Sequence, residues 1–262
     1  MRRAALLLAL LLLSGCGSGE DAPAAAPTPV PTPSPSVTEQ PWQTIRGPLG
    51  RCGPQPASAV EADLHYRVLH DPGVGSIPSV SAGRGRTVAV LLHQTDGNGL
   101  CGWLEHVPDL VAEPGIAVLA VDLCQYGGAR CHRGVDPTAA VRVAVSHARR
   151  VMHADRVVVV GASMGGSVAL MAASTLDGID AAVDLSGPVD WPGMELVGGG
   201  RSIDVPVLVA MARDEGPDQV RGARRIVAHA PRGSRFAPVG TGHGYDLLAR
   251  LAADVRAWVA AD

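Results

Sequence analysis

The chain has few aromatic residues and no lysine. Four Trp, three Tyr and one Phe are its only aromatic side chains among 262 residues, and its 22 basic residues are all arginine. The missing lysine excludes catalysis by a lysine nucleophile or Schiff base. The formal net charge is −3 at pH 7, so we expect neither a basic surface nor a nucleic-acid partner.

The N-terminus has the pattern of an export signal. Arg2 and Arg3 precede an apolar run over residues 4–13, which is too short to span a membrane. The run leads into LSGC at residues 13–16, which resembles the bacterial lipobox, where the cysteine is acylated. We predict a signal peptide over residues 1–15 and a lipid anchor on Cys16 at the extracytoplasmic face of the cell membrane. The alternative is an ordinary signal peptide followed by an incidental cysteine.

The segment after Cys16 differs in composition from the rest of the chain. Residues 16–46 are rich in Pro, Ala, Ser and Thr and can bury too little apolar surface to fold. We therefore expect this segment to be an extended tether. Residues 47–262 are long enough for one sizeable domain. We expect that domain to be catalytic and monomeric.

Four cysteines follow Cys16, and an even number in an exported chain indicates two disulfides. Three connectivities are possible, of which we favour Cys124–Cys131, closing a short loop, and Cys52–Cys101. The alternative is a zinc site using Cys124, Cys131 and His132, but this spacing matches no structural zinc pattern. We therefore expect no metal and no cofactor.

The most informative motif is VVVVGASMGG at residues 157–166, which places Ser163 in a G-x-S-x-G sequence after a β-branched run. A sharp turn from strand to helix exposes such a serine, and glycines must flank it because side chains at Gly161 and Gly165 would collide with nearby backbone. The alternative is a tight turn with a serine N-cap. The order of strand, turn and helix favours a nucleophile.

Strand-like and helix-like segments alternate along the rest of the chain, with apolar strands. We expect strands at residues 61–69, 77–82, 87–92, 116–123, 156–160, 180–185, 205–212 and 235–238, and helices at 100–111, 137–152, from 164, 217–228 and 245–260. This order predicts an α/β fold with a mainly parallel sheet covered on both faces. Chemistry in such sheets collects at the carboxyl ends of the strands.

Three candidate catalytic residues lie at those ends in the order serine, acid, histidine: Ser163, Asp214 and His243. Together with GASMGG and the late GTGHGYDLL, this order resembles the α/β-hydrolase family over about residues 60–260, closest to small bacterial esterases and dienelactone-hydrolase-like members. The resemblance implies a Ser–acid–His triad without a large cap domain. Glu215 is the alternative acid, although we prefer Asp214 because aspartate is the commoner triad acid.

The remaining site residues follow from the same pattern. The oxyanion hole is expected to use the backbone N–H of Met164 and a second donor from Gln94 or Thr95. Gln94 departs from the family, where glycine is usual, and His93 reads as a structural residue. Aromatic residues in the strand-end loops are expected to wall a substrate pocket: Trp103, Tyr126, Trp191 and Tyr245.

These features predict a lipid-anchored serine hydrolase that cleaves small or polymer-bound carboxylic esters. Few aromatics and no lid argue against long-chain triglycerides. Acyl transfer is a close variant, because an alcohol can replace water in capturing the acyl-enzyme. Two further functions fit the same fold, namely a non-catalytic envelope binding protein and a serine peptidase.

Overall fold

The computed structural model describes residues 42–96, 98–191 and 202–261. Contacts divide the chain into two units, Met1–Glu39 and Gln40–Asp262, and the described residues all belong to the second. The predicted signal peptide, Cys16 and most of the predicted tether therefore lie outside the described residues. No helix in the described part is both long and apolar enough to cross a membrane.

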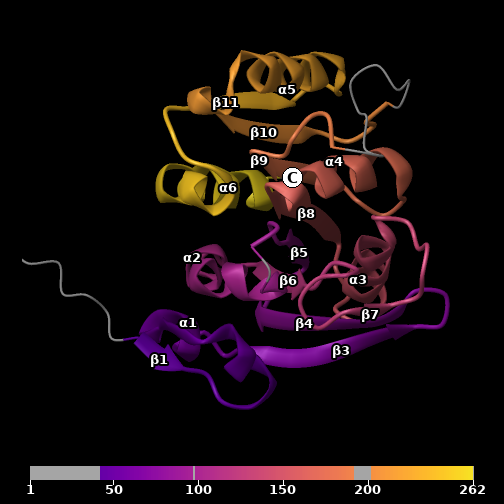
Figure 1. Ribbon diagram of the computed structural model, residues 1–262, viewed down its shortest axis with the longest axis vertical. Helices are drawn as coiled ribbons and strands as arrows, with labels where there is room; N and C mark the ends of the chain where they lie inside the picture. The colour runs from indigo at the N-terminus through magenta and orange to yellow at the C-terminus, as the bar shows by residue number, and fades with distance from the viewer. Residues whose placement is uncertain (1–41, 97, 192–201, 262) are drawn as a thin grey trace, which may run out of the picture. The chain divides into compact units, whose positions relative to one another are not determined.

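A nine-stranded sheet forms the centre of this unit, in the order β11-β10-β9-β8-β5-β6-β4-β3, with β7 paired to β4 (Figure 1). The strands are β3 (His65–Asp71), β4 (Gly75–Gly83), β5 (Thr87–Leu92), β6 (Ile116–Val121), β7 (Arg130–Cys131), β8 (Arg156–Ala162), β9 (Ala181–Leu185), β10 (Val207–Ala212) and β11 (Arg235–Val239). Strands β5, β6 and β8 to β11 pair in parallel, whereas β3, β4 and β7 pair antiparallel. The predicted α/β class and mainly parallel sheet are confirmed.

Helices cover both faces of the sheet (Figure 1). The α-helices are α1 (Ala57–Glu61), α2 (Val107–Val111), α3 (Ala139–Arg150), α4 (Met164–Thr175), α5 (Pro217–His229) and α6 (Leu248–Ala260), and the 3₁₀ turns are η1 (Gly47–Cys52), η2 (Gly99–His106), η3 (Arg213–Glu215) and η4 (Gly244–Leu247). One core lies under η2, α2 and α6, and the other lies under α3, α4 and α5.

Strand β8 illustrates why this sequence builds two cores. Side chains alternate across a strand, so Val157 and Val159 face the α3–α4 core while Val158 and Val160 face the α2–α6 core. All four are fully buried, as expected for a central parallel strand without a polar face. Only residues 186–206 separate β9 from β10, which is too few for a cap domain.

The N-terminal part of the domain differs from expectation. Strand β1 (Trp42–Thr44) pairs antiparallel with β2 (Pro54–Pro56), so the predicted domain start at residue 47 is too late. Helix α1 ends at Glu61 and β3 begins only at His65, later than the strand expected from residue 61. These elements are short and rich in Pro and Gly, which leaves no periodic signal in the sequence.

Both favoured disulfides are present in the structure. Cys52 pairs with Cys101 across 49 residues, and Cys124 pairs with Cys131 across 7. The first joins η1 to η2, where Arg51 also donates to both carboxylate oxygens of the buried Asp122 at 3.0 and 2.8 Å. The N-terminal segment is thus held to the loops at the carboxyl end of β5 and β6.

Candidate active site

Ser163 lies on a sharp turn between β8 and α4. Its backbone angles are φ 50° and ψ −121°, an uncommon region for a residue with a side chain. The turn requires its glycines, since a Cβ on Gly161 would lie 1.9 Å from the Gly165 carbonyl oxygen, and one on Gly165 would lie 2.3 Å from that of Leu92. The structure therefore has the strained elbow that the sequence motif predicts.

Two further side chains form a chain of contacts with Ser163. The Ser163 Oγ lies 2.6 Å from Nε2 of His243, which follows β11. The His243 Nδ1 lies 2.5 Å from Oε1 of Glu215, at the end of the η3 turn that follows β10. A proton on Nδ1 donates to the carboxylate and leaves Nε2 free to accept the serine proton. The three groups therefore have the geometry of a Ser–His–Glu triad.

The carboxylate in contact with His243 is Glu215, so the preference for Asp214 is wrong. Asp214 is exposed, whereas the Glu215 side chain is 21% exposed beside the imidazole. Both residues belong to the same 3₁₀ turn, in which successive side chains point about 120° apart. Only one of the two side chains can therefore face His243, and in this turn it is that of Glu215.

His93 fixes the backbone that follows β5. It is fully buried, its Nδ1 lies 2.7 Å from the Gln94 carbonyl oxygen, and its Nε2 accepts the Leu123 N–H at 2.9 Å. Since Nε2 accepts, Nδ1 carries the proton and donates to Gln94. Burial lowers the pKa of His93, which keeps the ring neutral. The Gln94 carbonyl faces His93, so the Thr95 N–H, on the other side of the planar trans peptide, faces away from it.

Gln94 contacts the loop that carries His243. Its backbone N–H donates to the Tyr245 hydroxyl at 3.4 Å, and its Oε1 accepts the Tyr245 N–H at 3.4 Å. A Cβ on Gly244 would lie 2.1 Å from that Oε1, so glycine is required for this approach. Because the Gln94 N–H is directed at Tyr245, Thr95 is the better placed of the two predicted second donors. The Met164 N–H, first in α4, has no acceptor within its own helix.

Two of the four predicted pocket aromatics line a cavity beside the elbow. Tyr126 and Trp191 border a space of about 170 Å³ together with the side chain of Met164. Trp103 does not line it: the side chain is fully buried, with its ring 5.0 Å from that of Tyr245 in a T-shaped contact. The prediction for Trp103 as a pocket wall is wrong, because η2 turns this ring into the core.

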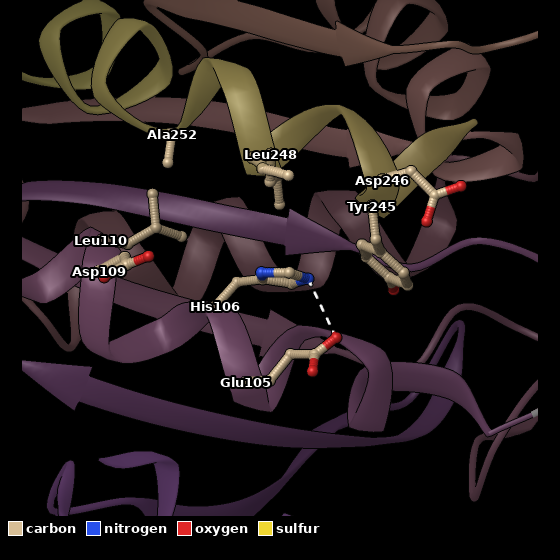
Figure 2. Close-up of a pocket in the computed structure, with 9 residues that line it drawn as sticks. Glu105, His106, Asp109, Leu110, Tyr245, Asp246, Leu248 and Ala252 are labelled. Atoms are coloured by element: carbon tan, nitrogen blue, oxygen red, sulfur yellow. Dashed lines mark ion pairs between the residues drawn. The ribbon is translucent and has the colours of Figure 1, made fainter. Parts of the chain in front are cut away.

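Tyr245 lines a different cavity, of about 290 Å³, between η2 and α2 on one side and η4 and α6 on the other. Figure 2 shows His106 and Tyr245 at this cavity, with His106 paired to Glu105. The His106 and Tyr245 rings lie 5.5 Å apart. Burial raises the pKa of the Tyr245 hydroxyl, which therefore stays protonated. The prediction of Tyr245 as a wall of the substrate pocket is therefore wrong: the ring does not line the cavity beside Met164, and its hydroxyl accepts the Gln94 N–H.

A buried acid lies behind the elbow. Asp184, at the end of β9, is fully buried and accepts the Gly187 N–H at 2.6 Å through Oδ1, while its Oδ2 has no partner among the described residues. A Cβ on Gly166 would lie 2.1 Å from Oδ1, so Asp184 packs directly against the start of α4. Burial, and then the nearby Glu215, raise its pKa well above the usual range. Nothing in the sequence pattern distinguishes this residue.

No group of three or more His, Cys, Asp or Glu side chains in the described residues is arranged to hold a metal ion. The zinc alternative at Cys124, Cys131 and His132 is excluded by the disulfide between the two cysteines.

Solved structures with the same architecture include known hydrolases. An esterase from Pyrococcus furiosus has a TM-score of 0.61 at 17% identity, with 76% of this chain and 89% of that chain covered. A dienelactone hydrolase from Anabaena variabilis has a TM-score of 0.59 at 14% identity, with 75% of this chain and 96% of that chain covered. A proline iminopeptidase from Mycobacterium smegmatis has a TM-score of 0.55 at 13% identity, with 74% of this chain and 97% of that chain covered. No protein-family model matches the chain, and no curated protein matches it. The chain therefore has the α/β-hydrolase fold.

Proposed function

We propose that the protein is a serine hydrolase that cleaves carboxylic esters through an acyl-enzyme on Ser163. The observation that carries this proposal is the contact chain from Ser163 Oγ to His243 Nε2, and from His243 Nδ1 to Glu215 Oε1. A non-catalytic binding protein would have no need for a nucleophile, a base and an acid from three separate strand ends in this order.

The reaction follows from the positions of these atoms. His243 Nε2 takes the proton of Ser163 as Oγ attacks the ester carbonyl, and the resulting imidazolium is stabilised by the Glu215 carboxylate. The same proton passes to the leaving alcohol as the carbon–oxygen bond breaks. Water then attacks the acyl-enzyme, with His243 taking its proton and returning one to Ser163, which releases the acid.

The negative oxygen of each tetrahedral intermediate needs donors that are already oriented. We assign this role to the backbone N–H groups of Met164 and Thr95. Met164 opens α4, whose N-terminal dipole favours a negative charge, and the His93 hydrogen bond to the Gln94 carbonyl holds the Thr95 peptide plane.

The cavity beside Met164 supports an uncharged substrate group. Its lining contains no charged side chain: Leu123, Cys124, Gln125, Tyr126, Val135, Pro137, Met164, Val168 and Trp191. An apolar cavity of about 150 Å³ holds a benzene ring, so a space of about 170 Å³ fits a small acyl or alkyl group. An esterase, a dienelactone hydrolase and a proline iminopeptidase share this fold, so ester cleavage is proposed from the small apolar cavity and not from these neighbours.

We also propose that the enzyme is exported and held at the extracytoplasmic face of the cell membrane by acylation of Cys16. The two disulfides agree with an oxidising compartment. Cys16 and the sequence around it lie outside the described residues, so this proposal rests on the lipobox-like LSGC and the export signal.

Covalent labelling tests the catalytic proposal directly. A fluorophosphonate probe should add to the peptide that contains Ser163, and Ser163→Ala should abolish both labelling and hydrolysis of short p-nitrophenyl esters. Ser174→Ala is the matched control, because Ser174 lies on the same helix and its hydroxyl donates to the Met171 carbonyl oxygen. Full activity of Ser163→Ala would remove the proposed mechanism.

Membrane attachment has a separate test. In the native host, the wild-type protein should enter the detergent phase on phase separation, and Cys16→Ser should shift it to an unprocessed or released form. Each buried methylene of an acyl chain contributes about 0.8 kcal/mol, so two or more chains on one residue make release slow. A mature protein that is fully soluble and begins at another residue would contradict the anchor and leave the hydrolase proposal standing.

A further inference from the structure

A groove of about 430 Å³ lies between the edge strand β3 and the C-terminal half of α3. None of the active-site residues lines it. Its side chains come from residues 67–71 of β3 and from residues 142–151 of α3 and its C-terminal end. Three of them are arginines: Arg67, Arg142 and Arg150.

These three guanidinium groups are not held by an ion pair within the described residues. Ion pairs within the described residues use Arg51, Arg86, Arg149, Arg221 and Arg235. Arg67, Arg142 and Arg150 form none of them, and none of their guanidinium groups has a hydrogen-bond acceptor within the described residues. All three are exposed.

The helix dipole does not explain the group. A basic residue in the last turn of a helix is stabilising, and α3 has two arginines there, Arg149 and Arg150. The dipole accounts for Arg150 as well as for Arg149, which also donates to the Asp155 and Gly178 carbonyl oxygens beyond the helix. Arg142 begins the second turn of α3 and Arg67 lies on a strand, so neither gains from the dipole.

Little negative charge balances the groove from within. The only carboxylate that lines it is Asp71, and one of its oxygens accepts the Gly73 N–H at 2.9 Å. The groove therefore holds an excess of positive charge in a chain whose formal net charge is −3. The two other titratable side chains at the groove are His70 and His147, and burial and Arg67 lower the pKa of His147.

The groove also has an apolar edge. Val151 is 53% exposed and is one of two large hydrophobic side chains in the described residues that are this exposed. It lies next to Arg150 in the chain and lines the same groove. A ligand that fits both features carries a negative group with several oxygens and an apolar part.

We propose that this groove binds the phosphate headgroup of an anionic lipid, with the three arginines on the phosphate oxygens and Val151 against the first part of the apolar chains. Guanidinium groups bind phosphate through paired N–H donors. A phosphate monoester, the headgroup of a phosphatidic acid, has three terminal oxygens and carries more charge than a carboxylate, which suits three guanidinium groups better than one carboxylate does. The proposal does not depend on the hydrolase activity.

Calorimetric titration of the full chain in a non-ionic detergent tests it with three probes: glycerol phosphate, dihexanoylphosphatidic acid and acetate. Every protein in this series carries Ser163→Ala, so that the ester bonds of the lipid are not cleaved during the titration. We expect the lipid to bind more tightly than glycerol phosphate, and acetate to bind most weakly. The double variant Arg142→Gln/Arg150→Gln should weaken lipid binding by about tenfold, since each of the two solvent-exposed charge contacts is worth about a factor of three. Added salt should weaken binding to the Ser163→Ala parent.

Arg225→Gln is the matched control, because Arg225 is exposed on α5 at the opposite edge of the sheet and does not line the groove. It should bind all three probes as the Ser163→Ala parent does, and unchanged melting temperatures would show that every variant is folded. Equal lipid binding by the double variant and the Ser163→Ala parent would overturn the site. Acetate binding as tight as glycerol phosphate would overturn the phosphate assignment, and lipid binding no tighter than glycerol phosphate would overturn the lipid assignment.

Discussion

At the scale of single residues, the triad depends on which carboxylate of the η3 turn faces His243. Glu215 Oε1 lies 2.5 Å from Nδ1, while Asp214 points to solvent. A carboxylate in this position keeps the imidazole in the correct tautomer and stabilises its charged form. Its neighbour in the sequence performs neither task.

We therefore expect Glu215→Gln to lower kcat by a factor on the order of 10³–10⁴, as loss of a triad acid does in serine proteases. Asp214→Asn is the matched control and should stay within about threefold of the wild type, because the exposed side chain has no contact with His243. Initial rates on a short p-nitrophenyl ester give both values. A severe loss in Asp214→Asn with a mild one in Glu215→Gln would mean that the turn rotates in solution.

The sequence can predict Ser163 and His243 but not the acid. Ser163 lies in a motif whose glycines have one structural explanation, and His243 lies between glycines at a strand end. Asp214 and Glu215 are adjacent after the same strand, and no periodic pattern records the rotation of a three-residue turn. The prediction for Trp103 fails for the same reason, since the direction of a ring on a 3₁₀ helix depends on tertiary packing.

At the scale of elements, the predictable part of the fold is the part with long apolar strands. Strand β5 has the predicted bounds, and the two helices α4 and α5 begin at the predicted residues. The short elements β1, β2, α1 and β7 are not predicted, because two to five residues carry too little pattern to be distinguished from a loop.

The contact between the β5–η2 loop and η4 leads to a second prediction. Tyr245→Phe removes the hydroxyl that accepts the Gln94 N–H and keeps the ring against Trp103. One such hydrogen bond is worth about 1 kcal/mol, so we expect kcat to fall about threefold to tenfold with KM unchanged, as the His243 and Thr95 loops lose their mutual position. In steady-state measurements kcat should fall, and the rate of fluorophosphonate labelling should fall by a similar factor.

Tyr66→Phe is a suitable control, since this tyrosine lies on β3 and does not contact Gln94. A change in melting temperature alone, with normal kcat per labelled site, would reduce Tyr245 to a structural role. A rise in KM with kcat unchanged would instead place its hydroxyl against the substrate.

At the scale of the whole molecule, both faces of the sheet bury groups that titrate. Burial lowers the pKa of three histidines: His93, His106 and His147. Burial raises the pKa of Asp184. The two kinds of group act on the free energy of unfolding in opposite directions, because the folded chain binds fewer protons at the histidines, and more at the aspartate, than the unfolded chain does.

These shifts predict that the protein loses stability on mild acidification. Each histidine has a usual pKa of 6.5 and a lower one when folded, so its contribution is complete above pH 6.5 and is lost as the pH falls below that value. Asp184 has a usual pKa of 3.8 and a higher one when folded, so it favours the folded state as the pH falls. Three histidines act in one direction and one aspartate in the other, and we expect the melting temperature to be lower at pH 5.5 than at pH 7.5. His106→Gln should reduce this difference in melting temperature between the two pH values. Asp184→Asn should increase the difference, because it removes the group that favours the folded state at low pH. His229→Gln serves as the control, since His229 is an exposed histidine on α5. A melting temperature that rises between pH 7.5 and pH 5.5 would show that Asp184 dominates and that the buried histidines accept protons without unfolding.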